Sequence, residues 1–173
     1  MRQKHWGGSS NLCEHHVELV KAKPQKAYSM WQGARAKGVE ALNNGDLHTA
    51  RQLLAVVFDI AKLQFASDIT QGSVQISSER FAESARYYLW VLGRVGDHKE
   101  AAACLQGAHD GLLHRSADQN VCYLERINAF EMLREFRIKR VSLLNVLGEG
   151  GADCAWARAA EALANKTKNT LLH

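Results

Sequence analysis

Two glycine–aspartate pairs constrain this chain more than any other feature: Gly45-Asp46 and Gly96-Asp97 each separate two long segments with helical apolar spacing. Glycine tolerates the left-handed conformation that ends many helices, and aspartate caps the first turn of a following helix. The two pairs lie 51 residues apart. We therefore expect an all-α fold in which antiparallel helices are joined by very short turns.

Apolar residues recur at helical spacing along most of the chain, whereas strand-like alternation is rare. We predict about seven or eight helices, with a break near residues 134–137 between the sixth and the seventh. Ser77 is the expected cap of the fourth helix, with Ile76 and Phe81 placed for a hydrophobic staple. The predicted ranges are about 12–22, 25–43, 47–66, 78–95, 98–113, 118–135, 138–147 and 152–166.

Length and composition fit one helical domain, because 173 residues with 46% hydrophobic content can bury a substantial core. We expect a flexible N-terminus over 1–10, a single domain over 11–167 and a frayed tail over 168–173. Within the domain we expect repeat-like units at about 27–66, 77–114 and 118–147, a linker at 67–76 and a capping helix at 152–166.

Net charge, cysteine content and apolar runs indicate the cellular compartment of the protein and the kind of partner it binds. The net charge of +4 is small for a nucleic-acid-binding protein. The four cysteines contain no C-x-x-C pair, and Cys104 and Cys122 lie in apolar segments, where cysteine acts as a small hydrophobe. The chain has neither a recognisable signal peptide nor an apolar run of membrane-spanning length. We expect a cytoplasmic protein without a membrane partner.

The two units resemble the tetratricopeptide repeat, a helix–turn–helix unit used mainly for protein–protein binding. The resemblance covers about residues 27–113. It depends on the small Gly38 seven positions before the first turn, on Ala50 and Ala101 after the turns, and on the bulky Leu54 and Leu105. The 51-residue spacing is longer than the family's period of about 34. Leu89 also replaces the small residue in the second unit, so a generic antiparallel bundle stays open.

This resemblance implies a non-enzymatic adaptor or chaperone-like module that binds a peptide or helix along the first helix of each pair. Aromatic and arginine side chains are common at the centre of such interfaces. We find no catalytic motif and predict neither enzymatic activity nor a cofactor, while a homo-oligomer stays open. The predicted binding residues are Trp31, Arg35, Arg86, Tyr87, Trp90 and Arg94.

Two alternatives use other residues. A basic turn could contact nucleic acid through the cluster Arg134, Arg137, Lys139 and Arg140, although nucleic acid is the less favoured partner. A metal-dependent helical enzyme could use Cys13, His15 and His16, but these supply two or three ligands at most. The simpler interpretation of Cys13, His15 and His16 is that they lie on a solvent-exposed face of a short helix, so we predict no metal site.

Overall fold

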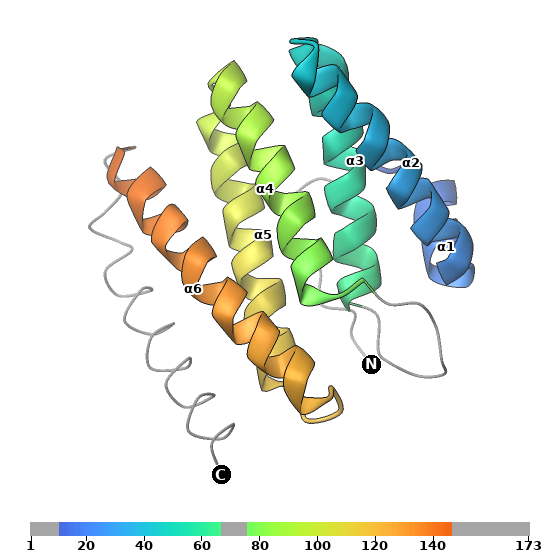
Figure 1. Cartoon of the computed structure of the whole chain (residues 1–173), viewed down its shortest axis with the longest axis vertical. Helices are drawn as coiled ribbons and strands as arrows, with labels where there is room; N and C mark the ends of the chain where they lie inside the picture. Colours follow the sequence, from blue (N-terminus) through green and yellow to red (C-terminus); the bar gives the residue numbers. More distant parts are fainter. Residues whose placement is uncertain (1–10, 67–75, 147–173) are drawn as a thin grey trace.

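The computed structural model describes residues 11–66 and 76–146, which form six α-helices and no β-strand (Figure 1). The predicted N-terminal segment 1–10, most of the linker 67–76, the capping helix 152–166 and the tail 168–173 lie outside these residues. The helices are α1 (Glu14–Ala22), α2 (Pro24–Asn43), α3 (Leu47–Ala66), α4 (Ser78–Val95), α5 (His98–Ala117) and α6 (Tyr123–Val146).

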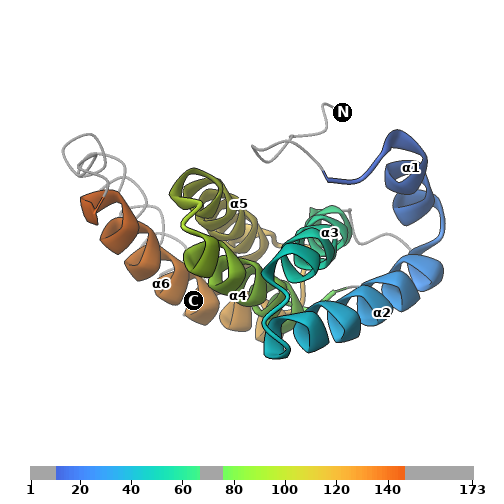
Figure 2. The same ribbon diagram turned by 90° about the horizontal axis from the view of Figure 1, so that it is seen from above.

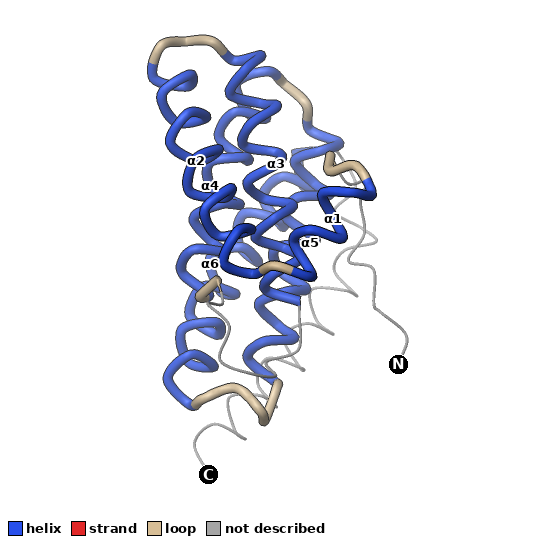
Figure 3. The backbone as a smooth tube through the Cα atoms, turned by 90° about the vertical axis from the view of Figure 1, so that its right-hand side faces the viewer, coloured by secondary structure: helices blue, strands red, loops and turns tan. Residues whose placement is uncertain are grey.

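The six helices form two layers (Figure 2). Each helix packs against the next one in the chain, and α2, α4 and α6 also contact one another in turn along one layer. The other layer holds α1, α3 and α5. Helices α2 to α6 extend along the long axis of the molecule (Figure 3), and each reverses the direction of the one before it, as the sequence colours of Figure 1 show. None of the helices within the described ranges is long and apolar enough to cross a membrane.

The two glycine–aspartate turns share a left-handed glycine and the hydrogen bonds of the aspartate. Gly45 and Gly96 have φ angles of +78° and +73°, in the left-handed region. The N–H of the following aspartate donates to a carbonyl five residues earlier in both turns, at 2.9 Å for Asp46 and 3.0 Å for Asp97. Each aspartate Oδ1 then accepts from the backbone N–H three residues later, at 3.0 Å and 3.1 Å. The prediction that these pairs end one helix and cap the next is confirmed.

Ser77 caps α4 as predicted, since its side chain accepts a hydrogen bond from the Arg80 N–H. The expected staple residues Ile76 and Phe81 are both buried in the core. At the start of α5, the Asp97 N–H donates to the Leu92 carbonyl of α4 and so does not donate to the Glu100 side chain. The Glu100 carboxylate accepts instead from the Tyr88 hydroxyl at 3.3 Å.

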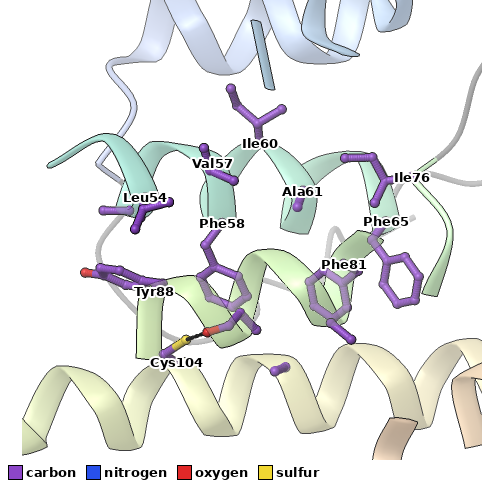
Figure 4. Packing of buried hydrophobic residues seen from close by; sticks show 14 of the residues in the cluster. Leu54, Val57, Phe58, Ile60, Ala61, Phe65, Ile76, Phe81, Tyr88 and Cys104 are labelled. Carbon is purple, nitrogen blue, oxygen red and sulfur yellow. Dashed lines mark hydrogen bonds between the residues drawn. The ribbon is translucent and has the colours of Figure 1, made fainter. Parts of the chain in front are cut away.

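Stacked aromatic rings fill the space between α3, α4 and α5 (Figure 4). The rings of Phe65 and Phe81 lie 4.2 Å apart between centroids and only 8° from parallel. A Cβ at Gly111 of α5 would stand 3.0 Å from the Phe81 ring. At Gly111 the missing side chain therefore makes room for the aromatic rings of the core.

Gly38 is the position where α2 comes too close to α3 for a side chain. An added Cβ would lie 2.9 Å from Cδ2 of Leu54 and 3.3 Å from Cβ of Leu53. Ala50 and Ala101, the alanines that follow the two turns and contribute to the resemblance, are 0% and 7% exposed. These small residues therefore lie inside the helix pairs, as the sequence predicts.

The predicted break at residues 134–137 is wrong, because α6 is continuous from Tyr123 to Val146. The described part of range 118–147 thus contains one helix, and the described residues contain six helices where seven or eight were expected for the whole chain. Ala129, Leu133, Phe136 and Leu144 continue one buried face through the supposed break. Of the charged residues that suggested a turn, Arg134 and Lys139 are exposed on other faces of this helix, while Arg137 and Arg140 are partly buried.

The boundaries of α5 and α6 also differ from those expected. Helix α5 continues to Ala117, and the turn that follows includes Val121 and Cys122. Burial of Cys104 is confirmed, and burial raises the pKa of its thiol. Cys122, by contrast, is exposed just before α6, so its predicted role as a core hydrophobe is wrong.

Candidate functional site

One line of side chains runs along the outer face of α4 and is called here the α4 stripe: Glu83, Tyr87, Trp90 and Arg94. Their spacing places them one above another on a helix. Trp90 is 52% exposed and Arg94 is exposed, whereas Glu83 and Tyr87 are partly buried. The buried face of α4 points the opposite way, toward the aromatic core. The α4 stripe therefore lies on the α2–α4–α6 layer, open to solvent at Trp90.

Helix α2 borders the α4 stripe through Arg35. The Arg35 guanidinium forms an ion pair with Glu83 and lies 5.7 Å from the Trp31 ring centroid and 5.5 Å from that of Tyr87. The hydrogen bond with Glu83 raises the pKa of Arg35. Arg35 thus joins the two helices electrostatically and holds the Tyr87 ring beside it.

Trp31 lies beneath this contact and not on the surface. Its side chain is 4% exposed, and its Nε1 donates to Oγ of Ser84 at 2.9 Å. The same Ser84 hydroxyl donates to the Arg80 carbonyl within α4. Of the predicted binding residues, Trp31 therefore supports Arg35 and the α2–α4 contact from inside.

Helix α6 borders the α4 stripe on its other side through Arg86. The Arg86 Nη2 and Nε donate to the Glu135 carboxylate at 2.5 Å and 3.0 Å, a two-point contact that fixes orientation. Lys139 lies 3.1 Å from the same carboxylate. The hydrogen bond from Arg86 lowers the pKa of Glu135. Arg86 is therefore held against α6, while Arg94 forms no ion pair with a described residue.

Exposed apolar side chains are concentrated on this same layer. Among the described residues, the large hydrophobic side chains with substantial exposure all belong to α4 and α6. Trp90 and Ile138, at 52% and 59% exposed, lie on α4 and α6 in the halves that follow the Arg86–Glu135 contact. The full set is Trp90, Val95, Tyr123, Leu124 and Ile138.

A polar cleft of about 360 Å³ lies on the other side of the molecule, where α3, α4 and α5 meet. Arg51 at its edge forms an ion pair with Asp97 at 2.5 Å. Burial raises the pKa of Tyr88, so its hydroxyl remains a donor toward Glu100. The sequence did not indicate this cleft, because its residues come from four segments with no common motif. They are Asn11, His48, Arg51, Gln52, Ala55, Tyr88 and Glu100.

The basic cluster proposed for nucleic acid is part of helix α6 and not a turn. Arg134 and Lys139 are exposed, while Arg137 and Arg140 are partly buried. Glu135 lies within the cluster and contacts both Arg86 and Lys139. The four basic residues thus surround the helix with an acidic residue among them, a different surface from the basic turn that was predicted.

The residues proposed as metal ligands lie at the start of α1 and make two separate contacts. Cys13 and His16 are in contact, with 3.0 Å between Sγ and Nδ1. The His15 ring centroid is 5.9 Å from that of His16. No group of three or more histidine, cysteine, aspartate or glutamate side chains within the described residues is arranged to hold a metal ion.

Comparison with known proteins adds no relative. No protein-family model, curated protein sequence or solved structure matches this chain. The function must therefore be argued from the geometry of its own residues.

Proposed function

We propose that this protein is a non-enzymatic scaffold that binds a peptide or helix of a partner protein across the α4 stripe. The observation that carries this proposal is Trp90, a half-exposed indole on a face where Arg35 and Arg86 are already held in ion pairs. Covering an exposed tryptophan removes a large apolar surface from water. Tryptophan, tyrosine and arginine are also the residues most often found at the energetic centre of an interface.

The contacts around Trp90 favour binding because they are made before the partner arrives. Arg35 holds the Tyr87 edge of the stripe, and Glu135 holds Arg86 at the other edge. Side chains that are already ordered lose less conformational freedom on association. A partner would therefore meet a rigid aromatic surface, with the exposed Arg94 one helical turn beyond Trp90 as a charged contact.

We also propose that the helix pairs form a tetratricopeptide-like array. Support comes from two turns with the same aspartate hydrogen bonds and from the antiparallel pairs α2–α3 and α4–α5. Gly38 and the buried Ala50 occupy the positions where such units need small residues. In that class the first helices of the units bind the partner. Here those helices are α2 and α4, which lie in the layer that carries the α4 stripe.

Quantitative affinity capture from the native host tests this proposal with two matched variants. Trp90→Ala removes the indole of the stripe, whereas Tyr123→Ala removes an aromatic side chain of similar exposure, 54%, at the start of α6. We expect wild type and Tyr123→Ala to retain the same partner and Trp90→Ala to lose it.

Stability provides the control, because an exposed side chain contributes little to folding. Both variants should unfold at the wild-type denaturant concentration. Partner retention by a folded Trp90→Ala protein would contradict the proposed surface.

A further inference from the structure

The contact between Cys13 and His16 has no part in the surface proposed above. Cys13 is the residue immediately before α1, and His16 follows one helical turn later on the same side. Their Sγ and Nδ1 atoms are 3.0 Å apart, and both side chains are exposed. The short spacing thus places a thiol and an imidazole together at a point that solvent and other molecules can reach.

Sulfur and imidazole nitrogen are the ligand types that zinc prefers in closed tetrahedral sites. With Zn–S at about 2.3 Å and Zn–N at about 2.0–2.1 Å, tetrahedral coordination places the two ligand atoms about 3.5 Å apart. Cys13 and His16 would need to separate by only about 0.5 Å from their present contact. Both side chains are exposed.

One copy of this pair offers half of a zinc coordination shell. The His15 ring lies beside that of His16, with 5.9 Å between centroids, but no third ligand joins the pair among the described residues. Among the described helices, α1 packs only against α2 and α3, and Cys13, Glu14, His15 and His16 are all exposed. A second chain can therefore approach the start of α1 directly.

We propose that Cys13 and His16 form half of a Zn²⁺ site that a second copy of the chain completes. Two copies related by a twofold axis present the same surface to each other and would supply two thiolates and two imidazoles. Each Cys13 thiol loses its proton when it coordinates the metal, so binding releases protons and is favoured as pH rises. The product is a zinc-linked dimer joined at the start of α1.

The test uses the untagged full-length protein, kept reduced by a phosphine, with Co²⁺ as the spectroscopic probe and Zn²⁺ for assembly. For wild type we expect a thiolate-to-cobalt charge-transfer band that saturates at one metal per two chains. Zinc should convert the monomer to a dimer in analytical ultracentrifugation, and a chelator should reverse the change. Cys13→Ser and His16→Ala should lose both effects.

Two further variants separate this pair from its neighbours. Cys122→Ser removes the other exposed cysteine of the described residues, and we expect it to bind metal and dimerise like wild type. His15→Ala should do the same. The proposal is overturned if Cys13→Ser keeps the thiolate band. It is equally overturned if metal binds one per chain without dimerisation, because the chain would then complete the site alone.

Discussion

At the scale of single residues, Gly38 shows how little space separates α2 from α3. Leu54 is fully buried, so its side chain cannot move into solvent to admit a methyl group at Gly38. Gly33, five residues earlier on the same helix, has nothing within 4 Å of an added Cβ. The same substitution should therefore have opposite effects at these two positions.

Gly38→Ala should lower the free energy of unfolding by about 1–2 kcal/mol, because overpacking costs about 1–3 kcal/mol and exceeds the gain in helix propensity. Gly33→Ala should raise it by about 0.5–1 kcal/mol, since only the propensity gain remains. Urea denaturation of the two variants checks both signs. Stabilisation by Gly38→Ala would mean that the helices can separate freely there.

At the scale of elements, the turns do more than connect helices, because they require one backbone conformation. Gly96 has a φ of +73°, which ordinary L-residues adopt only at a cost of about 1–2 kcal/mol. Gly96→Ala should reduce stability by about that amount, and Gly96→Asn by less, because asparagine tolerates this conformation better. Gly93→Ala, in the last turns of α4 with open space around it, should be stabilising. Thermal unfolding of the three variants distinguishes the turn from the helix.

The contact between α4 and α6 should make stability depend on acidity. Arg86 lowers the pKa of Glu135 in the folded protein, so this carboxylate stabilises the fold above its unfolded pKa of about 4.3. That contribution is lost as pH falls through the lowered folded pKa. The stability difference between wild type and Glu135→Gln should therefore be largest near neutral pH and disappear in acid.

Urea denaturation across a pH series measures this difference. Glu131→Gln is the matched control, because Glu131 is exposed one turn earlier on α6 and has no ion pair with a described residue. We expect its stability to follow that of wild type at every pH. A Glu135→Gln protein that does the same would show that the Arg86 contact contributes nothing to folding.

At the scale of the whole molecule, the sequence predicts what is determined locally. Helix ends at Gly45, Ser77 and Asp97 depend on residues within one turn of the chain, and their positions are confirmed. Contacts such as Arg86 with Glu135 join residues 49 positions apart, and helical spacing alone does not determine which residues of neighbouring helices lie level. For the same reason the burial of Trp31 was not predicted. Helical spacing places this residue on an apolar face but does not show how deeply neighbouring helices cover it.

The misread break in α6 and the unpredicted cleft have related causes. Charged residues around Phe136 suggested a turn, but no glycine, proline or cap interrupts the helix there, and the buried Phe136 continues the core. The cleft includes Asn11, whose N–H donates to the buried Asp59 at 2.5 Å. Asn11, which precedes the first helix, thus becomes part of the cleft only when the chain is folded.

The order of helix contacts has a consequence for how the chain acquires its structure. Among the described helices, contacts join only neighbours and next neighbours along the chain, so the ends need not meet. Closing long loops costs entropy before any contact compensates for it, and this topology largely avoids that cost. Folding can therefore begin with α2 and α3 while later helices are still being synthesised. Each later helix can then pack against helices that have already formed.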